Sequence, residues 1–153
     1  HRQYWHDVVG YNYRMTNICA AIGLAQLEQA PVFLQKKRAL AHYYAAYLDQ
    51  IGIHSLQESP GVTNSYWMFA MLVPEGHQRD ALRDALQQAG VETRPVFYPV
   101  HTMPMFSQRF QRHPVAEGIG WRGINLPSSP DLTPEKQDII LQAIKAFFTP
   151  KTA

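Results

Sequence analysis

Residues 65–97, SYWMFAMLVPEGHQRDALRDALQQAGVETRPVF, decide the fold, because they predict a strand, a helix and a second strand in succession. Ser65–Val73 is almost wholly apolar and is followed by a proline, which predicts a strand buried on both faces. The spacing of alanine and leucine predicts a helix over about residues 78–89, which a glycine stops. Val91–Phe97 is the next predicted strand. Pro95 has no N–H to donate and therefore places that strand at a sheet edge or marks its end.

Downstream of this unit, the sequence predicts two further helices and one further strand. Pro114 can begin a short helix that ends near Arg122, Ile124–Leu126 forms a brief strand, and Pro134 takes the first position of a terminal helix. Upstream of the unit, residues 53–65 contain proline, glycine and asparagine and are predicted to form a loop. The resulting order of elements is typical of an α+β or split-βαβ layer.

Two helical stretches precede that layer. The first runs from Thr16 to about Ala30, and the second begins at Pro31, whose missing N–H suits the first turn of a helix. Gly52 can close the second helix in a left-handed conformation. The inner stripe of the first helix is Ile18, Ala21, Ile22 and Ala25, and that of the second is Leu40, Tyr44, Tyr47, Leu48 and Ile51. We therefore expect an α+β fold in which two N-terminal helices precede a small sheet covered by helices.

The composition excludes several classes of protein. Hydrophobic residues make up 46% of the chain and charged residues 17%, which is typical of a folded domain, and the low charge suggests that part of the surface is an interface. A net charge of +2 with dispersed Lys and Arg does not indicate a nucleic-acid groove. The single cysteine, Cys19, allows no internal disulfide and is predicted to be a small core residue. No apolar run approaches the roughly 20 residues of a membrane span, so we expect a cytoplasmic protein without nucleic-acid or membrane partners.

The usual catalytic motifs are missing from the sequence. It contains no Gly-rich phosphate loop, no HExxH, no paired-cysteine zinc spacing and no G-x-S-x-G serine elbow. None of its seven histidines lies four residues from another, so we predict no metal site.

The stretch Gly10–Asn17, GYNYRMTN, is the least generic part of the chain. If it is extended, alternation places Asn12 and Arg14 on one face and the apolar side chains on the other. Thr16 or Asn17 can cap the following helix, so an amide, a guanidinium and free backbone N–H groups would converge on one anion site. The residue types alone leave open a plainer alternative, an asparagine in a turn and an arginine on the surface.

Residues 92–101, ETRPVFYPVH, form a second candidate stretch, a strand end followed by a loop that two prolines stiffen. We expect this loop to present Arg94, Tyr98 and His101 close together. His101 is then a candidate for hydrogen bonding or proton transfer, and the alternative is a structural loop histidine.

Three blocks of the sequence resemble, in the right order, the DegT-type nucleotide-sugar aminotransferases. They are GYNYRMTNICAAIGLAQLEQ at residues 10–29, GVETRPVFYPVHTMP at residues 90–104 and GINLPSSPDLTPE at residues 123–135. The similarity extends from about residue 4 to the end. It implies the fold of type I pyridoxal-phosphate (PLP) aminotransferases, with residues 1–30 as a dimer-crossing arm and first helix and residues 31–153 as the C-terminal small α+β domain.

The same resemblance implies an activity and roles for individual residues. These enzymes are homodimers that transfer an amino group from L-glutamate, through PLP, to a nucleotide-linked 4-keto-6-deoxysugar. Asn12 matches the asparagine that reaches the PLP phosphate of the neighbouring subunit, and Arg14 matches the arginine that meets the anionic substrate. His101 matches a histidine of the sugar site. Arg94 and Tyr98 belong to the same motif and are expected to shape that substrate pocket.

The chain departs from the family pattern in its length. The large N-terminal domain of these enzymes, with the lysine that forms the Schiff base, precedes the region that the chain matches. None of the chain's five lysines lies in a matching motif; they are Lys36, Lys37, Lys136, Lys145 and Lys151. We therefore expect that the chain is a C-terminal segment without catalytic residues of its own and inactive alone. The alternative is a non-catalytic fragment or paralogue that binds a nucleotide sugar or a partner protein.

Overall fold

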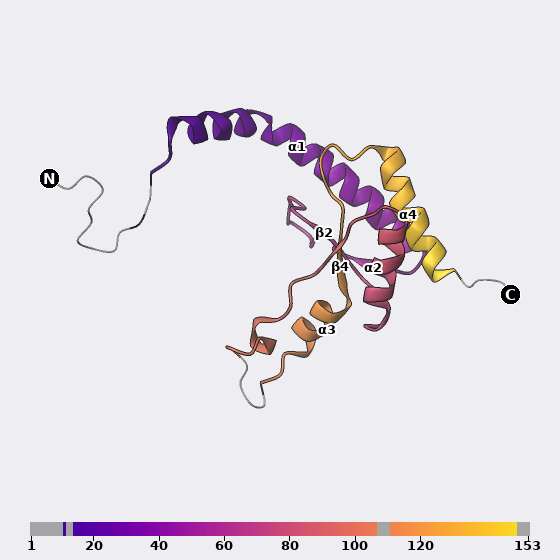
Figure 1. Cartoon of the computed structure of the whole chain (residues 1–153). Helices are drawn as coiled ribbons and strands as arrows, with labels where there is room; N and C mark the ends of the chain where they lie inside the picture. Colours follow the sequence, from indigo (N-terminus) through magenta and orange to yellow (C-terminus); the bar gives the residue numbers. More distant parts are fainter. Residues whose placement is uncertain (1–10, 12–13, 107–110, 150–153) are drawn as a thin grey trace. The chain divides into compact units, whose positions relative to one another are not determined.

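The computed structural model describes residues 11, 14–106 and 111–149. The chain divides into two compact units, residues 1–32 and residues 33–153. In chain order the elements are α1 (Asn17–Gln50), β1 (His54–Ser55), β2 (Phe69–Leu72), α2 (Gln78–Gln88), β3 (Arg94–Pro95), the 3₁₀ helix η1 (Val100–Thr102), α3 (Pro114–Arg122), β4 (Gly123–Leu126) and α4 (Pro134–Phe148) (Figure 1).

The strands form one antiparallel sheet in the order β1-β2-β4-β3. At its centre β2 pairs with β4, with Phe69 opposite Leu126 and Met71 opposite Ile124. Pro95 is the last residue of β3, which lies at an edge of the sheet. Both positions predicted for this proline are therefore confirmed, because an edge strand tolerates a residue that donates no hydrogen bond.

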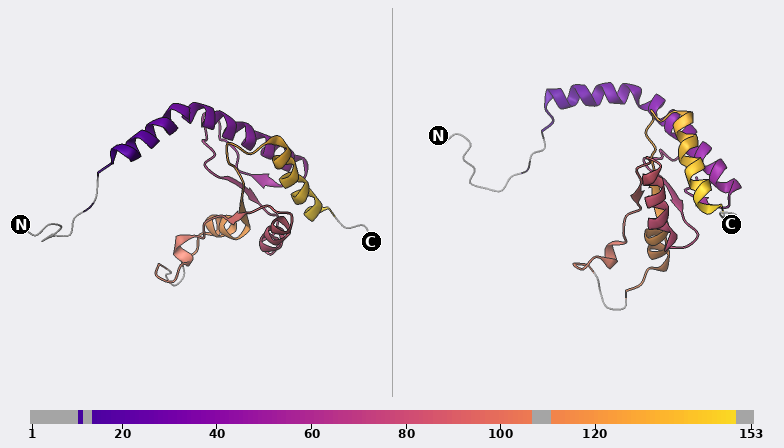
Figure 2. Two further views of the ribbon diagram at one scale, coloured as in Figure 1. Left: turned by 45° about the horizontal axis from the view of Figure 1, so that its top comes forward. Right: turned by 45° about the vertical axis from the view of Figure 1, so that its right-hand side comes forward.

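One face of the sheet forms the core together with three helices. The buried residues of α2, of α4 and of α1 after residue 32 join Phe69, Met71 and Ile124 in a single cluster. Tyr44 of α1 meets Phe69 edge to face at 5.2 Å between ring centres. In Figures 1 and 2, α4 runs beside the C-terminal part of α1, and Tyr43 of α1 donates a hydrogen bond to Asp138 of α4.

The prediction that β2 would be buried on both faces is wrong. Phe69 and Met71 are buried, whereas Ala70 and Leu72 are only half-buried. In an antiparallel sheet the helices need to cover only one face, so side chains on the second face can remain partly exposed. The strand is also shorter than the predicted Ser65–Val73. Its approach is bent at Tyr66, where φ is +48° and the N–H is held by the Asn64 side chain at 2.8 Å.

The two predicted N-terminal helices are one helix in the structure. α1 continues through Pro31. The proline removes one hydrogen bond, to the carbonyl of Leu27, and Leu27 is exposed, so water can satisfy that carbonyl. The predicted end of the helix is confirmed, because Gly52 follows it with φ of +73°.

The remaining boundaries agree with the sequence except at two short strands. α2, α3, β4 and α4 lie where they were predicted. The region 53–65, predicted as a loop, contains the two-residue strand β1, and the predicted strand 91–97 is reduced to the two residues of β3, Arg94–Pro95. Cys19 is exposed, which contradicts its predicted place in the core. Within the described residues, no helix combines the length and the apolar character needed to cross a membrane.

Candidate functional site

The first candidate stretch is described only in part. Asn12 lies outside the described residues. Arg14 is exposed and precedes the start of α1 by three residues. Arginine is suited to binding a phosphate or carboxylate, because it can donate two parallel hydrogen bonds to either group.

Capping residues occupy the first N–H groups of α1. Thr16 Oγ1 accepts the N–H of Cys19 at 3.2 Å, so Thr16 is the N-cap, as predicted. Asn17 Oδ1 accepts the N–H of Ile18 at 3.0 Å. The N–H groups of Ile18 and Cys19 are therefore not free for an anion, which differs from the expectation for these two groups.

The second candidate stretch does not gather its three side chains into one cluster. Arg94 is highly exposed, 3.7 Å from the equally exposed carboxylate of Glu92. Tyr98 contacts side chains of α2 and α3, and His101 contacts a carboxylate of α3. Each of the three side chains therefore has its own set of contacts, and those of Tyr98 and His101 attach the loop to α2 and α3.

Arg79, which sequence reasoning missed, fastens this loop. Its side chain is only 6% exposed. It donates to Gly120 O at 3.0 Å, to the Tyr98 hydroxyl at 3.2 Å and to Asp80 at 2.9 Å, and it lies over the rings of Tyr98 and Trp121. The hydrogen bond with Asp80 raises the pKa of Arg79 and lowers that of Asp80. One charged group thus ties α2, α3 and the loop together.

Two glycines let the loop lie directly against α3 and β4. A Cβ atom added to Gly120 would come within 2.7 Å of Pro99 Cδ, and one added to Gly123 within 2.5 Å of Val96 Cγ2. Contacts this short are not tolerated, so larger residues at either position would displace the loop.

His101 meets an ionised carboxylate. Its Nε2 lies 3.0 Å from Glu117 Oε1, and both side chains are largely buried, with 11% and 15% exposed. Glu117 also accepts the backbone N–H of His113 and two N–H groups of Arg112. These donors lower the pKa of Glu117 to about 2, with His113 first, then Arg112, then His101. Sequence reasoning found His101 but not this partner, sixteen residues away.

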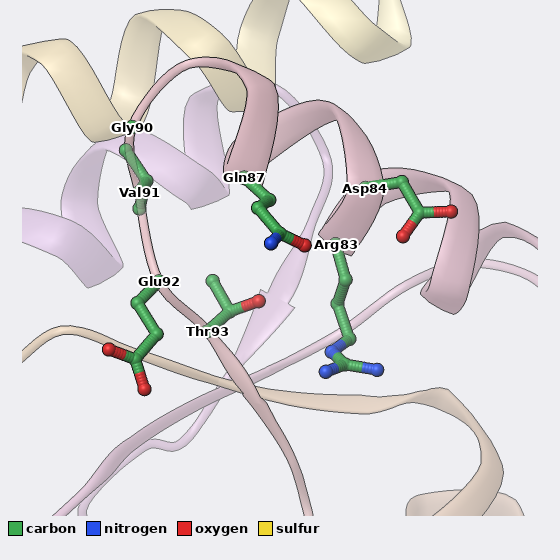
Figure 3. Close-up of a pocket in the computed structure, with 7 residues that line it drawn as sticks. All are labelled: Arg83, Asp84, Gln87, Gly90, Val91, Glu92 and Thr93. Carbon is green, nitrogen blue, oxygen red and sulfur yellow. The ribbon is translucent and has the colours of Figure 1, made fainter.

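Two hollows lie near these elements. The hollow in Figure 3, about 580 Å³, is at the C-terminal end of α2 and is lined by Arg83, Asp84, Gln87, Gly90, Val91, Glu92 and Thr93. None of the described site residues lines it. A second hollow, about 390 Å³, contains Arg94 and is completed by Trp67, Met68, Glu92, Asn125, Leu126 and Pro127. Among residues 11, 14–106 and 111–149 there is no group of three His, Cys, Asp or Glu that could hold a metal ion.

The chain belongs to the DegT/DnrJ/EryC1/StrS aminotransferase family, which it matches over residues 1–145. It is 54% identical over 151 residues to the GDP-perosamine synthase of Escherichia coli O157:H7, with 99% of the chain and 41% of that enzyme covered. It is 40% identical to the GDP-perosamine synthase of Vibrio cholerae, with 96% and 41% covered. The chain thus spans about two-fifths of the length of these relatives. The family resemblance of the sequence is confirmed.

Solved structures agree on the fold. Helicobacter pylori PseC, an aminotransferase involved in the biosynthesis of pseudoaminic acid, matches with a TM-score of 0.82 at 20% identity, over 97% of the chain and 42% of that structure. S. venezuelae DesV matches with a TM-score of 0.81 at 25% identity, over 99% of the chain and 42% of that structure. The α+β arrangement is therefore that of part of such an aminotransferase.

PLP is the cofactor of this family, and the described residues fit one of its groups. Its phosphate requires hydrogen-bond donors and positive charge, and Arg14, an exposed residue, brings positive charge to the segment that contains Asn12, the residue expected to bind that phosphate. Thr16 and Asn17 already accept the N–H groups of Cys19 and Ile18, so these two backbone donors are not available to a phosphate.

Proposed function

We propose that this chain works as the C-terminal part of a PLP-dependent aminotransferase that moves the amino group of L-glutamate to the keto carbon of a nucleotide-linked 4-keto-6-deoxysugar. The observation that carries the proposal is the 54% identity to a GDP-perosamine synthase over nearly the whole chain. That likeness favours a GDP-linked sugar. The relatives are more than twice as long as the matched segment, which supports assigning the activity to a whole enzyme of which this chain forms the C-terminal part.

The cofactor site is shared between two subunits in this proposal. Residues 1–30 act as an arm that carries Asn12 and Arg14 to the neighbouring subunit, and residues 31–153 form the small domain. Asn12 donates its amide to the cofactor phosphate, and Arg14 binds the carboxylate or phosphate of the substrate. When bound, PLP supplies the electron sink for moving the amino group. The exposed apolar residues at the start of α1 support an interface there.

The loop with Arg94, Tyr98 and His101 forms one wall of the sugar pocket. Arg79 and the close packing at Gly120 support this role, because they fix the loop before a ligand arrives. A fixed loop loses little conformational freedom on binding, so more of the contact energy remains as affinity.

The test is an assay of the complete enzyme with PLP, L-glutamate and GDP-4-keto-6-deoxymannose. We expect formation of the amino sugar and of 2-oxoglutarate in equal amounts. A folded, PLP-loaded enzyme that consumes glutamate but leaves this sugar unchanged would contradict the assigned substrate. A folded protein that binds the nucleotide sugar without any glutamate turnover would favour the non-catalytic alternative.

A further inference from the structure

The Glu117 carboxylate does more than begin a helix. It lies in the first turns of α3, where it accepts the N–H of His113, the N-cap residue, at 2.9 Å. That bond alone would fasten the start of the helix. The same oxygen, Oε1, is also 3.0 Å from His101 Nε2 on the candidate substrate loop. One largely buried carboxylate therefore joins α3 to the loop.

This contact determines which nitrogen of His101 carries the proton. A carboxylate with a pKa of about 2 is ionised at neutral pH and can only accept hydrogen bonds. A ring nitrogen 3.0 Å from it must therefore be the donor, Nε2–H. In the neutral imidazole, Nδ1 is then the acceptor.

The other groups around the ring do not compete for that role. The His113 ring meets His101 edge to face at 4.6 Å between centres, and His113 Nε2 is 3.2 Å from the Gln111 amide nitrogen. Arg112 binds the outer side of Glu117 and is 76% exposed. Glu117 is thus the group that orients the His101 imidazole within the described residues.

We propose that Glu117 is a positioning residue for the substrate pocket: it holds His101 as the Nε2–H tautomer, so that Nδ1 accepts a hydrogen bond from a hydroxyl of the sugar. This rests on the proposed function only in placing His101 at the sugar. The proposal specifies which group of the substrate His101 binds: an unprotonated Nδ1 accepts a hydrogen bond from a hydroxyl, whereas an ionised phosphate or carboxylate has no proton to donate. Without Glu117, no carboxylate would select one tautomer of the neutral His101 ring, so either nitrogen could carry the proton and either could face the sugar.

The test compares the two half-reactions of the complete enzyme in Glu117→Met, Glu117→Gln and Glu135→Met. The glutamate half-reaction is followed by the absorbance change of the bound cofactor, and the sugar half-reaction by kcat/KM for the nucleotide sugar. Glu117→Met removes the acceptor, and we expect kcat/KM for the sugar to fall about 10- to 100-fold with the glutamate half-reaction unchanged. Glu117→Gln keeps an acceptor oxygen and should retain most of the activity. Glu135, in the first turn of α4, is the matched control and should change neither half-reaction.

A double substitution separates positioning from general stability. If Glu117 acts through His101, adding Glu117→Met to His101→Ala causes no further loss. Additive losses, or equal losses in both half-reactions, would overturn the proposal. If the wild-type enzyme shows no glutamate half-reaction at all, the proposed function fails instead.

A measurement on unmodified protein covers the case in which Glu117→Met does not fold. Nitrogen-15 NMR of histidine-labelled complete enzyme, with His101→Asn used to assign the signal, reports the tautomer directly. We expect a protonated Nε2 and an unprotonated Nδ1 at a pH where the ring is neutral. The opposite tautomer, or an equal mixture, would overturn the proposal.

Discussion

The two parts of α1 obey the same helical spacing but differ in burial. After residue 32, the stripe Leu40, Ala41, Tyr44 and Leu48 is buried in the core. Before residue 32, the predicted apolar stripe is exposed, with Ile18 at 69% and Ile22 at 61% exposed; this is called the open part of α1. Gly23 lies in the same exposed part, and a Cβ atom added there would meet nothing within 4 Å. An apolar stripe therefore predicts a contact face, but not whether the partner surface belongs to the same chain.

The largest expected difference between the parts concerns stability. Tyr44 is fully buried and its hydroxyl donates to Pro127 O at 3.1 Å. Tyr44→Ala should lower the free energy of unfolding by about 3–5 kcal/mol, as for other large aromatic truncations. Ile22→Ala is the matched variant in the open part, and it should stay within about 0.5 kcal/mol of the wild type. Urea unfolding of the chain measures both. Equal losses would mean that the two parts are equally buried in solution.

Ile22 should matter once a second subunit is present. In the complete enzyme, Ile22→Asp places a charge in the proposed interface and should weaken dimerisation more than about tenfold. Ala20→Asp, on the opposite side of the helix, is the control and should leave the dimer intact. Sedimentation at several protein concentrations measures the dissociation constant. A dimer unaffected by Ile22→Asp would show that this stripe contacts something else.

The smallest expected difference between the two parts of α1 concerns how folding stability changes at acidic pH. The C-terminal part of α1 carries Arg38, which forms an ion pair with Glu58, donating at 3.1 Å to Oε2. Arg38 and then the N–H of Asn64 lower the pKa of Glu58 to about 2 from an ordinary 4.5. The folded state therefore binds fewer protons, so this stabilisation is complete above pH 4.5 and is lost as the pH falls towards 2.

Glu58→Gln should flatten that pH dependence. Urea unfolding of the variant between pH 6 and pH 3 should show a smaller loss of stability than the wild type, with Glu28→Gln, from the open part of α1, behaving as the wild type does. Parallel curves for wild type and Glu58→Gln would exclude Glu58 as a source of acid sensitivity. Glu117 supplies a second such carboxylate, so the slope should shrink rather than vanish.

Local signals in the sequence were the ones that predicted the fold correctly. Thr16 as a cap, Gly52 as a helix end and Pro95 at an edge each follow from the backbone chemistry of one residue. Pro31 caused the wrong prediction of two helices. A proline within a helix costs one hydrogen bond, and at an exposed carbonyl water can replace that bond. The bend at Tyr66 depends on the Asn64 side chain and shortened the predicted strand.

The contacts of the candidate site were harder to predict because they join distant parts of the chain. Arg79 bonds to Gly120, forty-one residues away, and neither residue lies in a motif with a known spacing. His101 could be singled out by its place in a proline-stiffened loop, but its tautomer depends on Glu117 of another helix. The family motif predicted the residues of the candidate site, and the structure adds the contacts that hold Tyr98 and His101.

In the proposed shared site, Asn12 serves the cofactor of the neighbouring subunit. Asn12→Ala in the complete enzyme should weaken PLP retention more than sugar binding. Mixed dimers, with Asn12→Ala in one subunit and the cofactor lysine substituted in the other, test whether the site is shared. If the site is shared, mixing two inactive variants should restore up to about a quarter of wild-type activity at limiting PLP, because about half of the dimers are mixed and each has one intact site. Mixed dimers that form but stay inactive would contradict the claim.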